Sequence, residues 1–198
     1  MSHTAINYNR RMGRWEPNSQ GRLVQAALEL YIERGFEQTT VAEIAKRAGL
    51  TERTFFRYFA DKREVLFWGA MSLQELLVST VATAPESEAP FATIRSAIEA
   101  AGSVFQDRRE GALQRQSVIT LNPELQEREL IKLASLAAAM AGELRRRGVA
   151  EPNASLSAEA GIAVLKIAFE SWVNDKGEMD LSQLIRETFD KLRAATAG

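Results

Sequence analysis

The chain has no cysteine, and its only histidine, His3, lies at the N-terminus. Disulfides, thiolate nucleophiles and histidine-based catalytic triads are therefore excluded, and the usual cysteine and histidine ligands of a zinc site are missing. The residue pattern also contains no metal-ligand cluster, no glycine-rich phosphate loop and no nucleophile–base pair. The sequence predicts no metal, no cofactor and no enzymatic activity.

Long apolar runs are absent as well. No run approaches the roughly 18 residues that a membrane-spanning helix needs, and the N-terminus lacks the apolar stretch of a signal peptide. We therefore expect a cytoplasmic protein with no membrane partner. The chain has 198 residues, of which 45% are apolar and 26% are charged. This composition supports a sizeable core, and the length favours two small domains over one large one.

The charge is distributed unevenly along the chain. Residues 1–63 carry 11 Lys and Arg against 7 Asp and Glu, whereas residues 64–198 have a net charge of −5. A basic first third on an acidic body indicates a nucleic-acid partner at one end only. The arm at residues 1–18 contains Arg10, Arg11 and Arg14. It is either a disordered tail or an arm that contacts phosphates or the minor groove.

Helix signals follow the arm in close succession. Apolar residues recur at helical spacing from Ser19, and Gly35 supplies a stop signal. Residues 40–43 form a capping box that begins a second helix, and Thr51 is a suitable N-cap for a third helix over residues 52–58. A further capping box at residues 61–64 predicts a long fourth helix. The turn between the second and third helices contains a glycine, which is typical of a helix-turn-helix.

The remainder of the chain reads as helix throughout. Residues 83–90, TAPESEAP, predict a loop after the fourth helix. Beyond this loop the pattern predicts five helices, over residues 91–106, 110–121, 123–147, 156–174 and 181–195. The predicted fold is all-α with about nine helices.

Two groups of residues in this helical body are candidates for binding. Aromatic and methionine side chains either line an apolar ligand cavity or simply fill the core. These candidates are Trp68, Met71, Phe105, Met140, Phe169 and Trp172. The last two helices carry apolar stripes that allow a two-fold symmetric four-helix interface between two copies. The stripe residues are Val164, Ile167, Ser171, Leu181, Leu184, Ile185, Thr188 and Leu192.

The segment from Thr39 to Lys62, TTVAEIAKRAGLTERTFFRYFADK, resembles the DNA-binding domain of the TetR family of transcriptional regulators. The resemblance is close over residues 19–68, whereas the rest of the chain is similar only in length and helical content. It implies a homodimer, usually a repressor, that binds a double-stranded operator. It also implies a small-molecule effector that binds the C-terminal domain and releases the DNA.

The resemblance also implies roles for individual residues. Thr51, Glu52, Arg53 and Thr54 are predicted to contact base edges, with Arg53 the strongest candidate because a guanidinium can bond guanine O6 and N7 together. The predicted contacts to the DNA backbone are Thr39, Thr40, Arg57, Tyr58, Lys62 and the basic arm. Phe56 departs from the family pattern, since a tyrosine whose hydroxyl bonds a phosphate is very common there.

The resulting hypothesis divides the chain into three parts. Residues 1–18 form a basic arm, residues 19–66 form the helix-turn-helix domain, and residues 67–198 form a ligand-binding and dimerisation domain. One alternative is an all-helical ligand-binding protein or enzyme with an incidental DNA-binding domain. A second alternative is a TetR-like activator.

Overall fold

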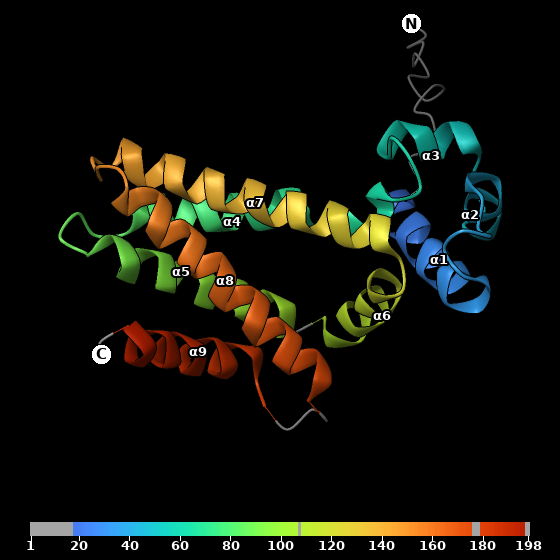
Figure 1. Cartoon of the computed structure of the whole chain (residues 1–198). Coiled ribbons are helices and arrows are strands. Elements are labelled where there is room, and N and C mark those ends of the chain that lie inside the picture. The colour runs from blue at the N-terminus through green and yellow to red at the C-terminus, as the bar shows by residue number, and fades with distance from the viewer. Residues whose placement is uncertain (1–17, 107, 176–178, 197–198) are drawn as a thin grey trace, which may run out of the picture.

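The computed structural model describes residues 18–106, 108–175 and 179–196, which form nine α-helices and one 3₁₀-helix and contain no strand. The predicted all-α class is therefore confirmed. Figure 1 shows short helices at one end of the molecule and a body of long helices at the other. In chain order the elements are α1 (Ser19–Arg34), α2 (Val41–Arg47), α3 (Glu52–Tyr58), the 3₁₀-helix η1 (Glu64–Phe67), α4 (Ala70–Thr83), α5 (Pro90–Gln106), α6 (Arg109–Thr120), α7 (Pro123–Arg146), α8 (Asn153–Asn174) and α9 (Leu181–Thr196).

The short N-terminal helices begin and end where the sequence predicts. Gly35 follows α1 with a φ of 88°, a conformation that glycine adopts without strain. The capping box is formed: the Thr40 amide donates to Glu43 Oε2 over 2.9 Å, and the Glu43 amide donates to Thr40 Oγ1 over 3.3 Å. Thr51 caps α3, with its Oγ1 3.2 Å from the amide nitrogen three residues later.

The prediction of one long helix from residue 61 is wrong, because the chain forms η1 before α4 begins. Asp61 Oδ1 accepts a bond from the Glu64 amide, but the Glu64 carboxylate binds Arg128 of α7 and does not return to Asp61. Arg115 Nε of α6 donates to the Leu66 carbonyl over 2.7 Å. In a continuous α-helix this carbonyl would accept the amide four residues later. A side chain from another helix is therefore bonded to the backbone where the helix is interrupted.

The body packs around one large core. Helices α4, α5, α7, α8 and α9 all contribute buried apolar side chains to it. In Figure 1, α4 and α7 lie side by side and α8 crosses α5. The crossing is close at Gly161, where an added Cβ would lie 2.3 Å from Cγ2 of Ile94. Glycine at this position allows α8 to pack directly against α5.

The N-terminal helices share their core with the body. The cluster around the fully buried Phe55 also includes Val118 and Ile119 of α6 and Leu125 of α7. The start of α7 and the end of α6 therefore pack as part of the N-terminal end of the molecule. The boundary predicted at residue 66 would leave these three side chains on the other side from the rest of their cluster.

The prediction that no stretch is long and apolar enough to span a membrane needs a correction. Residues Glu64–Thr83 have a mean hydropathy of 1.4, which by length and composition is enough for a membrane span. In the structure this stretch is divided into η1 and α4. Leu77 and Val81 of α4 are fully buried in the core of the body. The apolar composition of the inner face of α4 therefore serves the core.

Candidate nucleic-acid interface

The start of α3 presents the predicted base-reading residues to solvent. Thr51, Glu52 and Arg53 are exposed, and Thr54 is half-buried. The opposite face of the helix is anchored by the fully buried Phe55. Because α3 is short and one side is fixed in the core, its outer side chains have a defined direction.

The second turn of α3 carries the predicted backbone contacts. Arg57 Nη2 donates to the Tyr58 hydroxyl over 3.1 Å, and the guanidinium lies 4.8 Å from the centre of the Tyr58 ring. Phe56 is 56% exposed, and its ring packs edge-on against Phe55 at 5.5 Å. The exposed surface of α3 thus includes a phenyl ring that has no hydroxyl to donate to a phosphate.

Two of the predicted backbone contacts have another role in the structure. Thr39 is only 1% exposed, and its Oγ1 donates to the Gly35 carbonyl over 2.9 Å. The Lys62 ammonium donates to the carbonyls of Phe36, Glu37 and Thr39 at 2.8, 3.2 and 3.1 Å. An ammonium has only three N–H groups. In the structure without DNA, the donors of both side chains are therefore bonded to backbone carbonyls between α1 and α2.

Lys62→Met is expected to lower stability and to leave DNA specificity unchanged. The change removes charge-assisted bonds to partly buried carbonyls, so we expect a loss of roughly 1–3 kcal/mol in the free energy of unfolding. Urea unfolding followed by circular dichroism measures this loss. Unchanged stability together with a shallower salt dependence of DNA binding would instead make Lys62 a phosphate contact.

The other predicted phosphate contacts lie at the start of α2 and in the arm. Thr40 is exposed, and its hydroxyl takes part in the capping box. The hydrogen bond from the Thr40 backbone amide lowers the pKa of Glu43, which keeps that carboxylate charged. Arg10, Arg11 and Arg14 lie outside the described residues.

A polar network joins η1 to α6 and α7, and the sequence analysis missed it. Glu64 accepts bonds from Arg128 Nε at 2.7 Å and from Lys132 Nζ at 3.2 Å. Arg115 donates to the Leu66 carbonyl and to Glu129 Oε1 over 2.8 Å. The spacing of Arg128 and Lys132, four residues apart on one helix face, is the only sequence signal for it. We call the network of Glu64, Arg115, Arg128, Glu129 and Lys132 the η1 clamp.

Two family models match the chain. Residues 23–67 match the bacterial regulatory proteins of the tetR family, and residues 88–197 match the MftR C-terminal domain. The second match alone covers more than half of the chain. The protein belongs to the TetR family of transcriptional regulators. The resemblance noted from residues 39–62 is thereby confirmed.

Individual TetR-family relatives show the same relationship. The HTH-type transcriptional regulator TcmR of Streptomyces glaucescens is 34% identical over 94 residues, which are 47% of this chain and 42% of TcmR. The putative mycofactocin biosynthesis transcriptional regulator MftR of Mycobacterium tuberculosis is 27% identical over 93% of this chain and 94% of MftR. The crystal structure of Thermus thermophilus FadR, a TetR-family repressor in complex with lauroyl-CoA, is 25% identical, with a TM-score of 0.56 over 89% of this chain and 94% of FadR.

The dimer surface predicted for this TetR-family chain needs correction. Val164, Leu181 and Ile185 are buried in the core of their own subunit, so they cannot contact a second copy. The other predicted residues remain accessible to different degrees. Ile167 and Ser171 are exposed, whereas Leu184, Thr188 and Leu192 are half-buried.

Three exposed residues of α8 and the half-buried Ala160 form a row that the sequence analysis recognised only in part. Leu156, Ala160, Ala163 and Ile167 follow one another at intervals of three and four residues, which places them on one face. Leu156 and Ile167 are among the large apolar side chains exposed in the described residues. We call these four residues the α8 row. The helical register from Leu156 would have identified it.

The predicted ligand residues do not form one cavity in the described part of the chain. Met140 and Trp172 are fully buried, whereas Trp68, between η1 and α4, and Met71 of α4 are exposed. The rings of Phe105, Phe169 and Trp172 pack together, with centroids 5.7 and 5.6 Å apart. The structure also contains no group of three or more histidine and acidic residues placed to hold a metal ion among the residues it describes.

Proposed function

We propose that this TetR-family regulator is a repressor that binds a near-palindromic operator as a homodimer and is released by a small apolar effector. The main support for this proposal is the η1 clamp. It connects η1, at the end of the DNA-binding part, to α6 and α7, which also contact the helical body. The shared core around Phe55 adds apolar contacts at the same place. A shift of α6 or α7 would therefore move the recognition helix α3.

On the DNA side, each subunit places α3 in a major groove. Thr51, Glu52, Arg53 and Thr54 are the proposed base-reading residues, and Thr40, Arg57, Tyr58 and the basic arm are the proposed backbone contacts. In a dimer the two copies of α3 must lie roughly 34–36 Å apart to enter successive grooves. The effector acts by favouring a subunit arrangement in which that spacing is lost.

The proposed dimer surface is the α8 row together with the accessible side of α9. Small side chains at Ala160 and Ala163 allow close approach of two α8 helices, and Leu156 and Ile167 supply the apolar area. Leu184, Thr188 and Leu192 extend this surface along α9. The result is a four-helix interface with two helices from each subunit.

A fatty acyl thioester is the effector that we propose to test first. The FadR of Thermus thermophilus holds lauroyl-CoA, and its fold matches this chain over most of its length. Since the relatives are transcriptional regulators, we assign no catalytic role. Because its target is genomic DNA, we place the regulator in the cytoplasm.

Lauroyl-CoA is expected to weaken operator binding by about 5–150-fold, the range of a coupling free energy of 1–3 kcal/mol. The operator is first selected from random DNA with the full chain, and binding is then measured by fluorescence anisotropy. Acetyl-CoA is the matched control, because it has the same head group without the long chain.

Two outcomes would overturn parts of this proposal. Equal binding to the selected and the random DNA would falsify sequence-specific recognition. Retention of the operator at saturating lauroyl-CoA would exclude this effector. A reporter assay in which the regulator raises expression from its operator would show an activator instead.

A further inference from the structure

The outer side of the packed helices α4 and α7 carries a long apolar surface. Trp68 and Met71 near the start of α4 are 43% and 65% exposed. Leu130 and Ile131 on α7 are exposed as well. Single exposed apolar side chains need no explanation, but several on two helices that pack together mark a binding surface.

Two sets of contacts show how α4 is placed against α7. Glu64 is paired with Arg128 and Lys132, so the start of α4 lies beside this part of α7. Further along, Val78 and Gly142 line the same groove. Both helices therefore run in the same direction, away from the DNA-binding end (Figure 1). We call the strip between them the α4–α7 seam.

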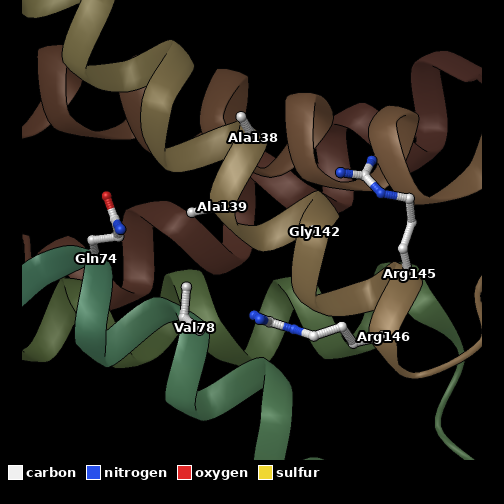
Figure 2. Close-up of a pocket in the computed structure, with 7 residues that line it drawn as sticks. All are labelled: Gln74, Val78, Ala138, Ala139, Gly142, Arg145 and Arg146. Atoms are coloured by element: carbon white, nitrogen blue, oxygen red, sulfur yellow. The ribbon is translucent and has the colours of Figure 1, made fainter.

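The far half of the seam is a groove of about 570 Å³. It is lined by Gln74, Val78, Ala138, Ala139, Gly142, Arg145 and Arg146. Small side chains keep it open, since Ala138, Ala139 and Gly142 present almost no side-chain volume on this face of α7. Figure 2 shows the two arginines at one end, with the side chain of Arg146 extending toward Val78.

The seam thus has an apolar length and a cationic end. From Ile131 to Arg146 it spans sixteen residues of α7, and their fifteen steps of 1.5 Å cover roughly 22 Å. A guanidinium is well suited to bind a carboxylate or a phosphate through parallel hydrogen bonds. An apolar chain with an anionic group at one end matches both features.

We propose that the α4–α7 seam binds a long-chain amphipathic anion, with the chain along Met71, Val78 and Ala138 and the anionic group at Arg145 and Arg146. This inference rests on the proposed function, because it gives the effector a place on the surface of α4 and α7. A ligand in the seam would contact both α4 and α7. The η1 clamp connects the start of α7 to the DNA-binding end.

The arginines are already paired in the structure, which bears on the cost of binding. Arg145 contacts Glu151, and Arg146 contacts Glu143. The Arg145–Glu151 pair is exposed on both sides, and such pairs contribute little to stability, so an incoming anion can replace Glu151 at small cost. The Glu143 side chain is only 12% exposed, so Arg146 keeps this partner and offers the anion its other N–H groups. Binding also buries apolar surface that water now covers.

Dodecanoate and dodecanol are suitable probes, because they share a chain and differ in the charge of the head. We expect the full-length protein to bind dodecanoate at least tenfold more tightly than dodecanol, with a blue shift of Trp68 emission as its indole leaves water. A Trp68→Phe variant identifies the part of the signal that comes from this residue. The double variant Arg145→Gln/Arg146→Gln should bind the two probes alike.

Arg193→Gln provides the control, because this arginine is an exposed cation on α9, outside the seam. It should retain the tenfold preference for dodecanoate. The proposal is overturned if Arg145→Gln/Arg146→Gln retains this preference, or if dodecanoate binds without changing Trp68 emission. Operator selectivity without any probe tests the proposed function separately, so the two failures can be told apart.

Discussion

Replacing Ile167 with glutamate is expected to produce a monomer that binds the operator about 100–10,000-fold more weakly. Ile167 is 54% exposed at the C-terminal end of the α8 row. At a two-fold interface the substitution would place two like charges in an apolar contact. Loss of the dimer removes the gain from binding two half-sites at once, which accounts for the size of the effect. Sedimentation and operator titration measure the two consequences.

Val164→Ala is the matched comparison for this prediction. Val164 lies one turn from Ile167 but is buried in its own subunit. We expect it to lower the melting temperature by removing core contacts and to leave the dimer intact. If Ile167→Glu remained a dimer at micromolar concentration, the α8 row would not be the interface.

Arg53→Ala is expected to have the largest effect on base recognition. A bidentate contact to guanine contributes about 1–3 kcal/mol, and the dimer carries the substitution in both half-sites, so the total loss is roughly 2–6 kcal/mol. Binding to random DNA should change much less. Repeating the selection from random DNA with the variant should show relaxed preference at one base pair in each half-site.

Arg57→Ala tests the distinction between reading and anchoring on the same helix. Arg57 follows Arg53 by one turn, and its guanidinium lies against Tyr58. As a phosphate contact it should weaken binding to all sequences alike and reduce the salt dependence. An unchanged selected site for Arg53→Ala, or a changed one for Arg57→Ala, would reverse the two roles.

Local signals in the sequence were sufficient to place most elements. Helix ends depend on contacts within a few residues, so the sequence can predict them. The structure contains the predicted caps at Thr40 and Thr51 and the predicted stop at Gly35. The break before α4 was missed, and it coincides with a bond from the Arg115 side chain to the Leu66 carbonyl, 49 residues away. No local pattern contains that contact.

The candidate surfaces show the same limit. An apolar stripe predicts that a helix face is buried, but it does not show whether the same subunit or a second copy covers that face. Val164, Leu181 and Ile185 were assigned to the dimer surface for this reason, although they are buried in their own subunit. Lys62 is basic and lies within a DNA-binding motif. Only the folded chain shows that its ammonium is occupied by three carbonyls.

The shared core around Phe55 has a consequence for building chimeric regulators. Val118, Ile119 and Leu125 belong to helices that follow the DNA-binding segment by about 50 residues, yet they complete its interior. Transplanting residues 18–67 onto a foreign sensor domain would leave an apolar hole where these three side chains now sit. A functional graft has to carry the α6–α7 corner with it, so operator specificity and effector response in this protein are not freely interchangeable parts.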